Sequence, residues 1–207
     1  MTNETQRVDV LIVGAGLTGI GLARHLQREC PQDSFALLES RSAIGGTWDL
    51  FRYPGIRSDS DMYTFSYGSR PWLAPNSLGD GPKIRSYISE AAAEAGVDKH
   101  IRFQHKVVSA SWSSDDACWT VTALRTDTNE SVYFVCNFLM MCCGYYDYEN
   151  GYTPDFPGRD SFTGQVIHAQ HWPEDLDYAG KRVVVIGSGA TAITLVPELA
   201  KQTKHTV

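Results

Sequence analysis

Residues 8–19 read VDVLIVGAGLTG, a near-continuous apolar run followed at once by a turn with three glycines. The apolar run predicts a buried parallel strand, and apolar residues recur at helical spacing from Ile20 to Leu26. Residues 35–39 predict a second strand that ends at an acidic residue, Glu39. A strand, a glycine turn, a helix and a second strand in this order predict a βαβ unit that binds a dinucleotide.

Each glycine of this first turn has a physical role in a Rossmann unit. Gly14 permits the tight bend, Gly16 lets the backbone approach a pyrophosphate, and Gly19 lets the helix pack closely on the strand. Glu39 follows Gly19 by 20 residues, where a carboxylate accepts hydrogen bonds from a ribose hydroxyl. The pattern favours an adenine dinucleotide with a free ribose 2'-OH; the alternative is a glycine-rich turn in an ordinary α/β domain.

A second turn of the same kind lies near the end of the sequence, where residues 181–192 read KRVVVIGSGATA. Residues 181–186 predict another parallel strand, and Gly187, Gly189 and Ala192 take the three glycine places, the last with a permitted alanine. The sequence contains no residue that would bind the ribose of this second site, so it does not distinguish NAD from NADP. Proteins with two dinucleotides usually pass electrons between them.

Composition excludes several classes of function. Of the 207 residues, 18 are Lys or Arg and 24 are Asp or Glu, and a net charge of -6 argues against a nucleic-acid partner. The polar start lacks the apolar core of a secretion signal, and no apolar run approaches the roughly 20 residues of a membrane span. We therefore expect a cytoplasmic protein with no integral membrane segment; peripheral attachment to a membrane stays open.

The five cysteines form no Cys-x-x-Cys pair, which argues against a disulfide framework, a dithiol redox centre and a metal site. Because Cys142 and Cys143 follow an apolar run, we expect them to be buried thiols in a strand.

The middle of the chain predicts a long binding loop, a helix and a meander. Residues 41–81 lack periodicity, which is typical of a binding loop. Residues 83–95 predict a helix closed by a left-handed Gly96. Three strand-like runs, residues 102–112, 118–124 and 131–143, suggest an antiparallel meander attached to the parallel sheet. Residues 145–180, rich in Pro and Gly, predict a connector.

Residues 162–173 read FTGQVIHAQHWP and fit the pattern F-x-G-x-x-x-H-x-x-x-W-P. This pattern, here called the fingerprint, resembles that of the type I Baeyer-Villiger monooxygenases and ends just before the second glycine turn, as it does in that family. The N- and S-oxygenating flavin monooxygenases have a similar pattern, but with Tyr or Phe at the position of Trp172. The resemblance implies catalytic roles for His168 and Trp172.

The loop resembles the same family, with GGTW at residues 45–48 and RYPGIRSD at residues 52–59. In the family this segment lies along the flavin, which implies FAD contacts for Gly46, Thr47, Trp48 and Asp59, and the matching aspartate supports an active-site arginine. On spacing alone, Asp59 is also compatible with a solvated loop carboxylate. The longer strings, residues 45–63 and 171–197, look like the ethionamide-activating branch, which oxidises ketones and thioamides.

The resemblance covers essentially the whole sequence and implies a domain plan. Residues 1–144 would be a Rossmann-type FAD-binding domain with a parallel sheet and an antiparallel meander, residues 145–180 a connector, and residues 181–207 the start of an NADP-binding domain. NADPH would reduce FAD, and one oxygen atom of O2 would enter a ketone to give an ester or lactone, or oxidise the sulfur of a thioamide or sulfide. The natural substrate and the oligomeric state stay open.

In the family the active-site arginine comes later than the residue that matches Val207. We therefore expect the 207 residues to be an incomplete, inactive fragment with an exposed apolar patch; its expected members are Val183, Val185, Ile193, Val196 and Leu199. The alternatives are an N- or S-oxygenating flavin monooxygenase and a non-catalytic FAD-binding remnant. Flavin-disulfide reductases would need a cysteine pair at redox spacing.

Overall fold

The computed structural model describes residues 5–207. Contacts within the chain divide it into two compact units, each built from two separate stretches. Unit 1 comprises Met1–Gly46 and Ile84–Gly144, and unit 2 comprises Thr47–Lys83 and Tyr145–Val207.

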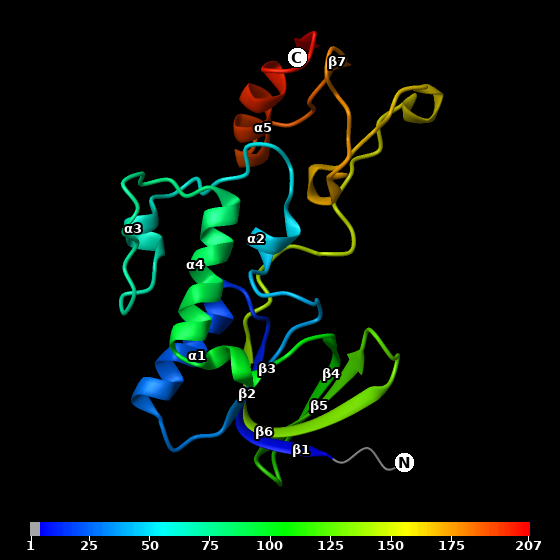
Figure 1. Cartoon of the computed structure of the whole chain (residues 1–207). Coiled ribbons are helices and arrows are strands. Elements are labelled where there is room, and N and C mark those ends of the chain that lie inside the picture. The colour runs from blue at the N-terminus through cyan, green and yellow to red at the C-terminus, as the bar shows by residue number, and fades with distance from the viewer. Residues whose placement is uncertain (1–4) are drawn as a thin grey trace. The chain divides into compact units, whose positions relative to one another are not determined.

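A six-stranded sheet forms unit 1, in the order β3-β2-β1-β6-β5-β4 (Figure 1). Its four parallel strands are β1 (Gln6–Val13), β2 (Phe35–Leu38), β3 (Ile101–Arg102) and β6 (Ser131–Met141). Its antiparallel part adds β4 (His105–Ser113) and β5 (Cys118–Arg125), and β5 pairs with β6. The predicted meander attached to a parallel sheet is thereby confirmed, and the chain has a mixed α/β fold.

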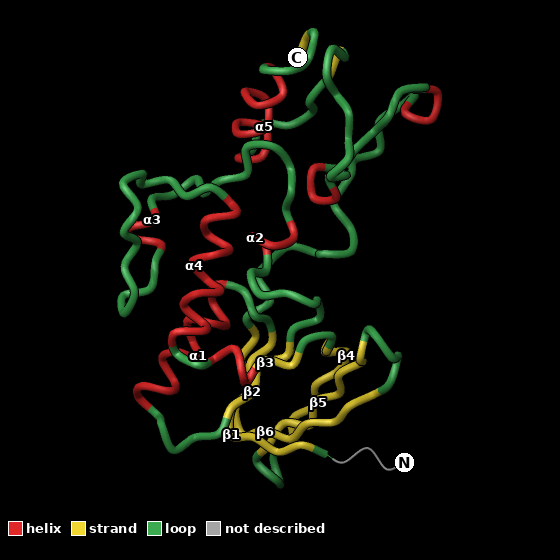
Figure 2. The backbone as a smooth tube through the Cα atoms, in the orientation of Figure 1, coloured by secondary structure: helices red, strands yellow, loops and turns green. Residues whose placement is uncertain are grey.

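Two helices lie along one side of this sheet (Figure 2). They are α1 (Leu17–Glu29) and α4 (Gly81–Glu94), followed by the short 3-10 helix η1 (Val97–His100). Ile20 of α1 and Ile84 and Ile88 of α4 are fully buried, and the guanidinium of Arg24 donates a hydrogen bond to the carbonyl of Ala91 between the two helices. Gly96 closes α4 with a left-handed φ of 68°, as the sequence predicts.

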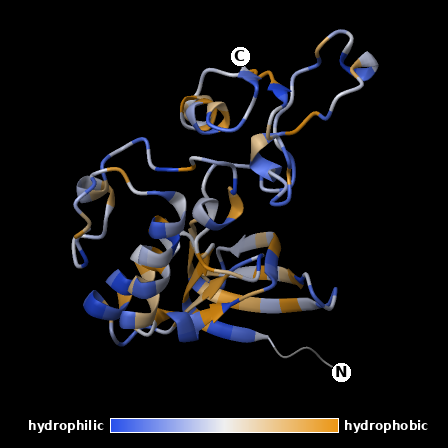
Figure 3. Cartoon of the chain, turned by 45° about the horizontal axis from the view of Figure 1, so that its top comes forward, coloured by the Kyte–Doolittle hydropathy of each residue, from blue (hydrophilic) through white to orange (hydrophobic). Residues whose placement is uncertain are grey.

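A buried cluster lies between the parallel strands and the meander. Phe134 and Cys136 of β6 and Val121 of β5 are fully buried there, against Leu11 of β1 and Leu38 of β2. Hydrophobic residues, coloured orange, accordingly concentrate on the strands of the sheet (Figure 3). The burial of both sides of β1 explains why its sequence is a continuous apolar run instead of an alternating one.

Unit 2 contains short elements around a smaller core. Its helices are α2 (Thr47–Leu50), α3 (Met62–Phe65), η2 (Arg159–Ser161), η3 (Ala169–His171) and α5 (Ala190–Ala200), and its two-stranded sheet pairs β7 (Arg182–Val183) with β8 (His205–Thr206) in parallel. The core cluster consists of Phe51, Tyr53, Leu195 and Leu199. The aromatic residues come from the stretch after α2, so this stretch covers the inner side of α5.

The expected apolar patch is wrong in part. Leu199 is 1% exposed, and Val183 and Val185 pack, partly buried, against the unit 2 core. Phe51 and Tyr53 cover these residues, and no pattern in the sequence predicts this contact. Of the expected members, Ile193 is exposed, and the other large exposed apolar residues in this part of the chain are Val184, Ile186 and Val207.

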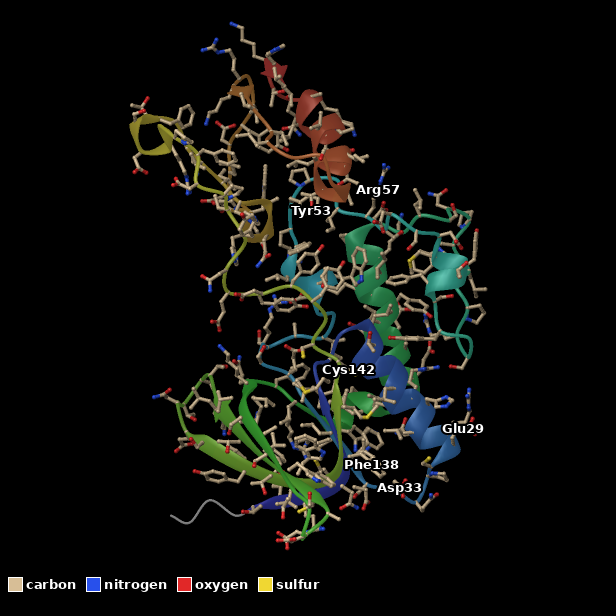
Figure 4. All side chains as sticks on the ribbon, turned by 180° about the vertical axis from the view of Figure 1, so that it is seen from behind. Glu29, Asp33, Tyr53, Arg57, Phe138 and Cys142 are labelled. Carbon is tan, nitrogen blue, oxygen red and sulfur yellow. The ribbon has the colours of Figure 1, made fainter. Side chains whose placement is uncertain are left out.

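Two expected strand ends are also wrong. The strand predicted over residues 181–186 is reduced to Arg182–Val183 because its partner β8 spans two residues, although hydrogen bonds between Val185 and Val207 and between Val207 and Val183 prolong the pairing. Strand β6 ends at Met141, so Cys142 is half-buried and Cys143 is exposed beyond it. Cys142 lies at the end of β6 (Figure 4), where its amide donates to Val13.

The predicted loop of residues 41–81 contains the two four-residue helices α2 and α3. Asp61 caps α3 by accepting the amide of Thr64 at 2.9 Å. Helices of four residues are too short to leave a periodic pattern in the sequence, so the sequence does not predict them.

Candidate cofactor-binding and active site

The first glycine turn has the close packing that its sequence predicts. Gly14 has a φ of 106°, and its amide donates to the carbonyl of Leu38 at 2.8 Å. A methyl group on Gly19 would stand 1.9 Å from the carbonyl oxygen of Gly14. Helix α1 therefore starts directly against the end of β1, and only a glycine fits at position 19.

Glu39 lies at the end of β2 with 4% of its surface exposed. Its Oε2 accepts the amide of Ala15 at 2.8 Å, and its Oε1 accepts the amide of Arg41 at 3.0 Å. These bonds compensate for burying the carboxylate beside the glycine turn. Since each carboxylate oxygen has two acceptor sites, Oε2 can accept one further donor such as a ribose hydroxyl.

A second pair of glycines lies over the first turn. The amide of Gly45 donates to the carbonyl of Ala15 at 3.1 Å, and a methyl group on Gly16 would reach Gly46 Cα at 3.5 Å, an ordinary contact. Protein packing alone therefore does not require a glycine at position 16. The approach of a pyrophosphate stays the predicted reason for it.

The N-terminus of α1 lies at the same glycine turn. Gly16 is its N-cap and offers no side chain to bond the first amides of the helix. Those amides and the positive end of the helix dipole suit a phosphate group. The donor set and the glycine backbone thus fit the dinucleotide that the sequence predicts.

Thr47 and Trp48 open unit 2 on helix α2. The hydroxyl groups of Thr47 and Tyr148 lie 3.4 Å apart, and the ring of Trp48 meets that of Phe65 edge-on at 6.3 Å. Asp49 is buried in the same helix and binds Arg52 at 2.9 Å. The GGTW segment is therefore fixed on both sides by polar and aromatic contacts.

The loop that carries Asp59 is anchored through its neighbour. Ser58 is 2% exposed; its amide donates to Gly79 at 2.8 Å, and its hydroxyl accepts the amide of Gly79 at 2.9 Å. Arg57, labelled together with Tyr53 in Figure 4, pairs with Asp80 in a β-bridge. Asp59 itself is exposed. A single serine in a loop gives no sequence signal of such a long-range anchor, so only the structure reveals the role of Ser58.

The two fingerprint residues differ in their surroundings. Trp172 is partly buried against the core of unit 2, with its ring 6.0 Å from that of Tyr178. His168 is exposed, and its Nδ1 accepts the amide of Gln170 at 3.2 Å. Asp59, His168 and Trp172 share unit 2, and among residues 5–207 no hydrogen bond or ring contact joins them.

The second glycine turn repeats the form of the first. Gly187 has a φ of 151°, and Gly189 is the N-cap of α5 without a side-chain cap. A methyl group on Gly187 would lie 4.0 Å from that of Ala192, so the alanine in the third place is accommodated. The predicted turn and helix are therefore present at the predicted residues.

The sequence pattern gives no sign of an aromatic group around Tyr146 and Phe51. The ring of Tyr146 lies 5.0 Å from that of Phe51 and 4.6 Å from that of Tyr145. Burial, its hydrogen bond with Tyr145, and the nearby Tyr145, Tyr53 and Asp59 raise the pKa of Tyr146 to about 12. Tyrosines in a connector carry no sequence signal for such a grouping, because their partners come from a distant stretch.

Residues 5–207 contain neither a candidate metal site nor a candidate membrane-spanning helix. No three His, Cys, Asp or Glu side chains gather there in a way that would hold a metal ion. In the same range, no helix combines the length and the apolar character required to cross a membrane.

Comparison with known sequences finds relatives over nearly the whole chain. A family model described as flavin-binding monooxygenase-like matches residues 8–207. The chain is 57% identical over 195 residues to the FAD-containing monooxygenase EthA of Mycolicibacterium smegmatis, an alignment that covers 94% of this chain and 39% of the relative. It is 52% identical over 196 residues to the probable FAD-binding monooxygenase AlmA of Acinetobacter baylyi, covering 95% and 39%.

Solved structures agree with the sequence relatives. An oxidised steroid monooxygenase bound to NADP matches with a TM-score of 0.81 and 31% identity over 97% of this chain and 38% of its own. An open crystal structure of cyclohexanone monooxygenase matches with a TM-score of 0.83 and 29% identity over 98% and 39%. The chain thus spans about two fifths of the length of the proteins it resembles.

The family model covers nearly the whole chain, and both glycine turns lie at the residues that the sequence predicts. The chain belongs to the flavin-binding monooxygenase-like family, as the fingerprint and the loop motifs indicate.

Proposed function

We propose that the protein carrying this chain is an FAD- and NADPH-dependent monooxygenase. FAD would bind at the first turn, with Gly14, Gly16, Gly19 and Glu39, and along Gly46, Thr47, Trp48 and Asp59. NADPH would bind at the second turn, with Gly187, Gly189 and Ala192. The observation that carries this proposal is that each turn places a glycine N-cap, which has no side chain to cap the helix, at the start of the following helix, the arrangement that suits two phosphate-bearing cofactors.

The proposed reaction inserts one oxygen atom of O2 into a ketone to give an ester or lactone. FAD, when bound and reduced, supplies the oxygen-activating chemistry, and the protein positions the substrate and excludes water. A cyclohexanone-bound cyclohexanone monooxygenase is among the similar structures, with 29% identity over 98% of this chain. Trp172 favours this reaction over simple S- or N-oxygenation, since the enzymes of that type carry Tyr or Phe there.

Within this proposal the three candidate catalytic residues have separate tasks. Asp59 would support an active-site arginine from outside this chain, and its exposed carboxylate is accessible to one. His168 would act through its exposed imidazole, and Trp172 would hold the fingerprint on the core of unit 2. The division into residues 1–144, 145–180 and 181–207 is likewise proposed from the family resemblance.

The test uses the full-length protein. We expect it to purify with about one FAD per chain and to oxidise NADPH faster when cyclohexanone is added, with 18O from labelled O2 in the lactone. The 207 residues alone should give no product. A protein that binds no flavin would contradict the proposal, and a protein that oxidises thioanisole but no ketone would instead be an S-oxygenating relative.

A further inference from the structure

Gly151 lies directly against the imidazole ring of His168. A methyl group on Gly151 would stand 2.4 Å from both Cε1 and Nδ1 and 2.8 Å from Nε2, whereas heavy atoms in good contact lie about 3.5–4.0 Å apart. Gly151 is not among the residues with a positive φ, so its backbone conformation does not call for a glycine. The ring of His168 is therefore what requires this glycine.

The second contact of the imidazole determines where its proton lies. Nδ1 accepts the backbone amide of Gln170 at 3.2 Å, and a ring nitrogen that accepts an N–H carries no proton itself. In the neutral ring the proton is then on Nε2. Because the donor is a backbone amide, which has no acceptor form, this assignment does not depend on the orientation of a side-chain amide.

Gln170 ties this arrangement to the segment that carries Gly151. Its side chain is buried, 6% exposed, and its Nε2 donates to the backbone carbonyl of Asp147. The carboxylate of Asp147 accepts the amides of Glu149 and Asn150 at 2.9 and 3.2 Å, which closes the turn just before Gly151. Two contacts therefore join residues 147–151 to the fingerprint. One is the hydrogen bond from the side-chain amide of Gln170 to Asp147, and the other is the packing of Gly151 against the ring of His168.

We propose that Gly151 and Gln170 are positioning residues that hold His168 as the Nε2–H tautomer, so that Nε2–H is a neutral hydrogen-bond donor for an acceptor oxygen of cofactor or substrate. The exposure of His168 leaves this donor accessible. The catalytic part of the inference rests on the proposed function, whereas the tautomer does not. Neither Gly151 nor Gln170 belongs to the F-x-G-x-x-x-H-x-x-x-W-P pattern.

Gly151→Ala is the direct test, because a movement of the His168 side chain can relieve the clash with the new methyl group. The new methyl group meets the end of a side chain, which can rotate away at little cost to folding, but this rotation breaks the Nδ1 bond. We therefore expect a Tm within about 2 °C of the parent protein together with a changed tautomer. Gly68→Ala is the matched control, since a methyl group there meets nothing within 4 Å and Gly68 has no positive φ.

The measurement is a long-range proton–nitrogen NMR spectrum of the full-length protein labelled with 15N-histidine, with His168→Asn to assign the signals. We expect the Nε2–H tautomer of His168 in the parent and in Gly68→Ala, and a mixture of tautomers in Gly151→Ala. Gln170→Leu, which removes the bond to Asp147 and keeps the backbone amide, should also give a mixture. Gln170→Leu thus provides a second measurement of the His168 tautomer if Gly151→Ala folds poorly.

Activity separates this inference from the proposed function. With cyclohexanone and NADPH we expect kcat/KM to fall about tenfold or more in Gly151→Ala and Gln170→Leu and to stay unchanged in Gly68→Ala. An Nδ1–H tautomer in the parent, or an unchanged tautomer in both variants, would overturn the positioning role. A changed tautomer with full activity would overturn its link to the reaction. A parent that shows the expected tautomer but no oxygenation would contradict only the proposed function.

Discussion

At the scale of single residues, Gly19 has the least room in the first turn. A methyl group there would lie 1.9 Å from the oxygen and 3.0 Å from the carbon of the Gly14 carbonyl. Both atoms belong to the backbone between β1 and α1, so they cannot turn aside as a side chain would. The close fit of strand and helix therefore depends on this glycine.

We expect Gly19→Ala to lower the free energy of unfolding by about 2 kcal/mol and to abolish the retention of FAD, because α1 must move away from β1. Urea unfolding and the ratio of flavin to protein after purification measure the two effects. Gly68→Ala, in open space, serves as the control. A Gly19→Ala protein with unchanged stability and flavin content would show that the contact between position 19 and the Gly14 carbonyl does not constrain the turn.

Tyr146 gives a prediction about pH. Its ordinary pKa of 10.0 is raised to about 12, chiefly by burial and then by Tyr145. Between these two values the folded protein keeps a proton that the unfolded chain has lost, so this contribution to stability is present below about pH 10 and is lost as the pH rises toward 12. Since Tyr146 is 39% exposed, solvent limits the size of the effect.

Titration of the phenolate absorbance should therefore show a tyrosine that ionises near pH 12, and Tyr146→Phe should remove this step. In that variant the unfolding free energy should also fall less between pH 10 and 12. If the ionisation at high pH disappears in Tyr145→Phe but persists in Tyr146→Phe, its assignment to Tyr146 is wrong.

At the scale of elements, α5 is held by one face only. Leu199 is 1% exposed and packs on Phe51 and Tyr53, whereas Ile193 of the same helix is 64% exposed. The periodicity of the sequence predicts the helix and its apolar residues correctly. It does not show which of them have a partner, because that partner is the stretch after α2, more than a hundred residues earlier.

We expect Leu199→Ala to cost about 3 kcal/mol and Ile193→Ala to change stability by less than about 0.5 kcal/mol. Hydrogen exchange of the amides of α5 measures both, because opening of this helix exposes them. Equal protection in the two variants would show that the cluster with Phe51 and Tyr53 does not hold the helix.

At the scale of the whole molecule, the two compact units do not follow the order of the chain. The domains predicted from the family resemblance, residues 1–144, 145–180 and 181–207, are consecutive stretches and stay a prediction, which the grouping of contacts does not test. In the structure Thr47–Lys83 groups with Tyr145–Val207. This grouping depends on contacts between stretches far apart in sequence, and a pattern read along the chain contains no such information.

The sequence by itself determines the strands β1 and β2, the two glycine turns, the meander and the family, because these depend on local spacing: apolar runs, helical periodicity and glycines at fixed intervals. Only the tertiary structure decides that Glu39 binds Ala15, that Gly151 lies on His168 and that Leu199 is covered. The physical reason is that close packing and hydrogen bonding join groups many residues apart, and the folded chain alone sets which of them meet.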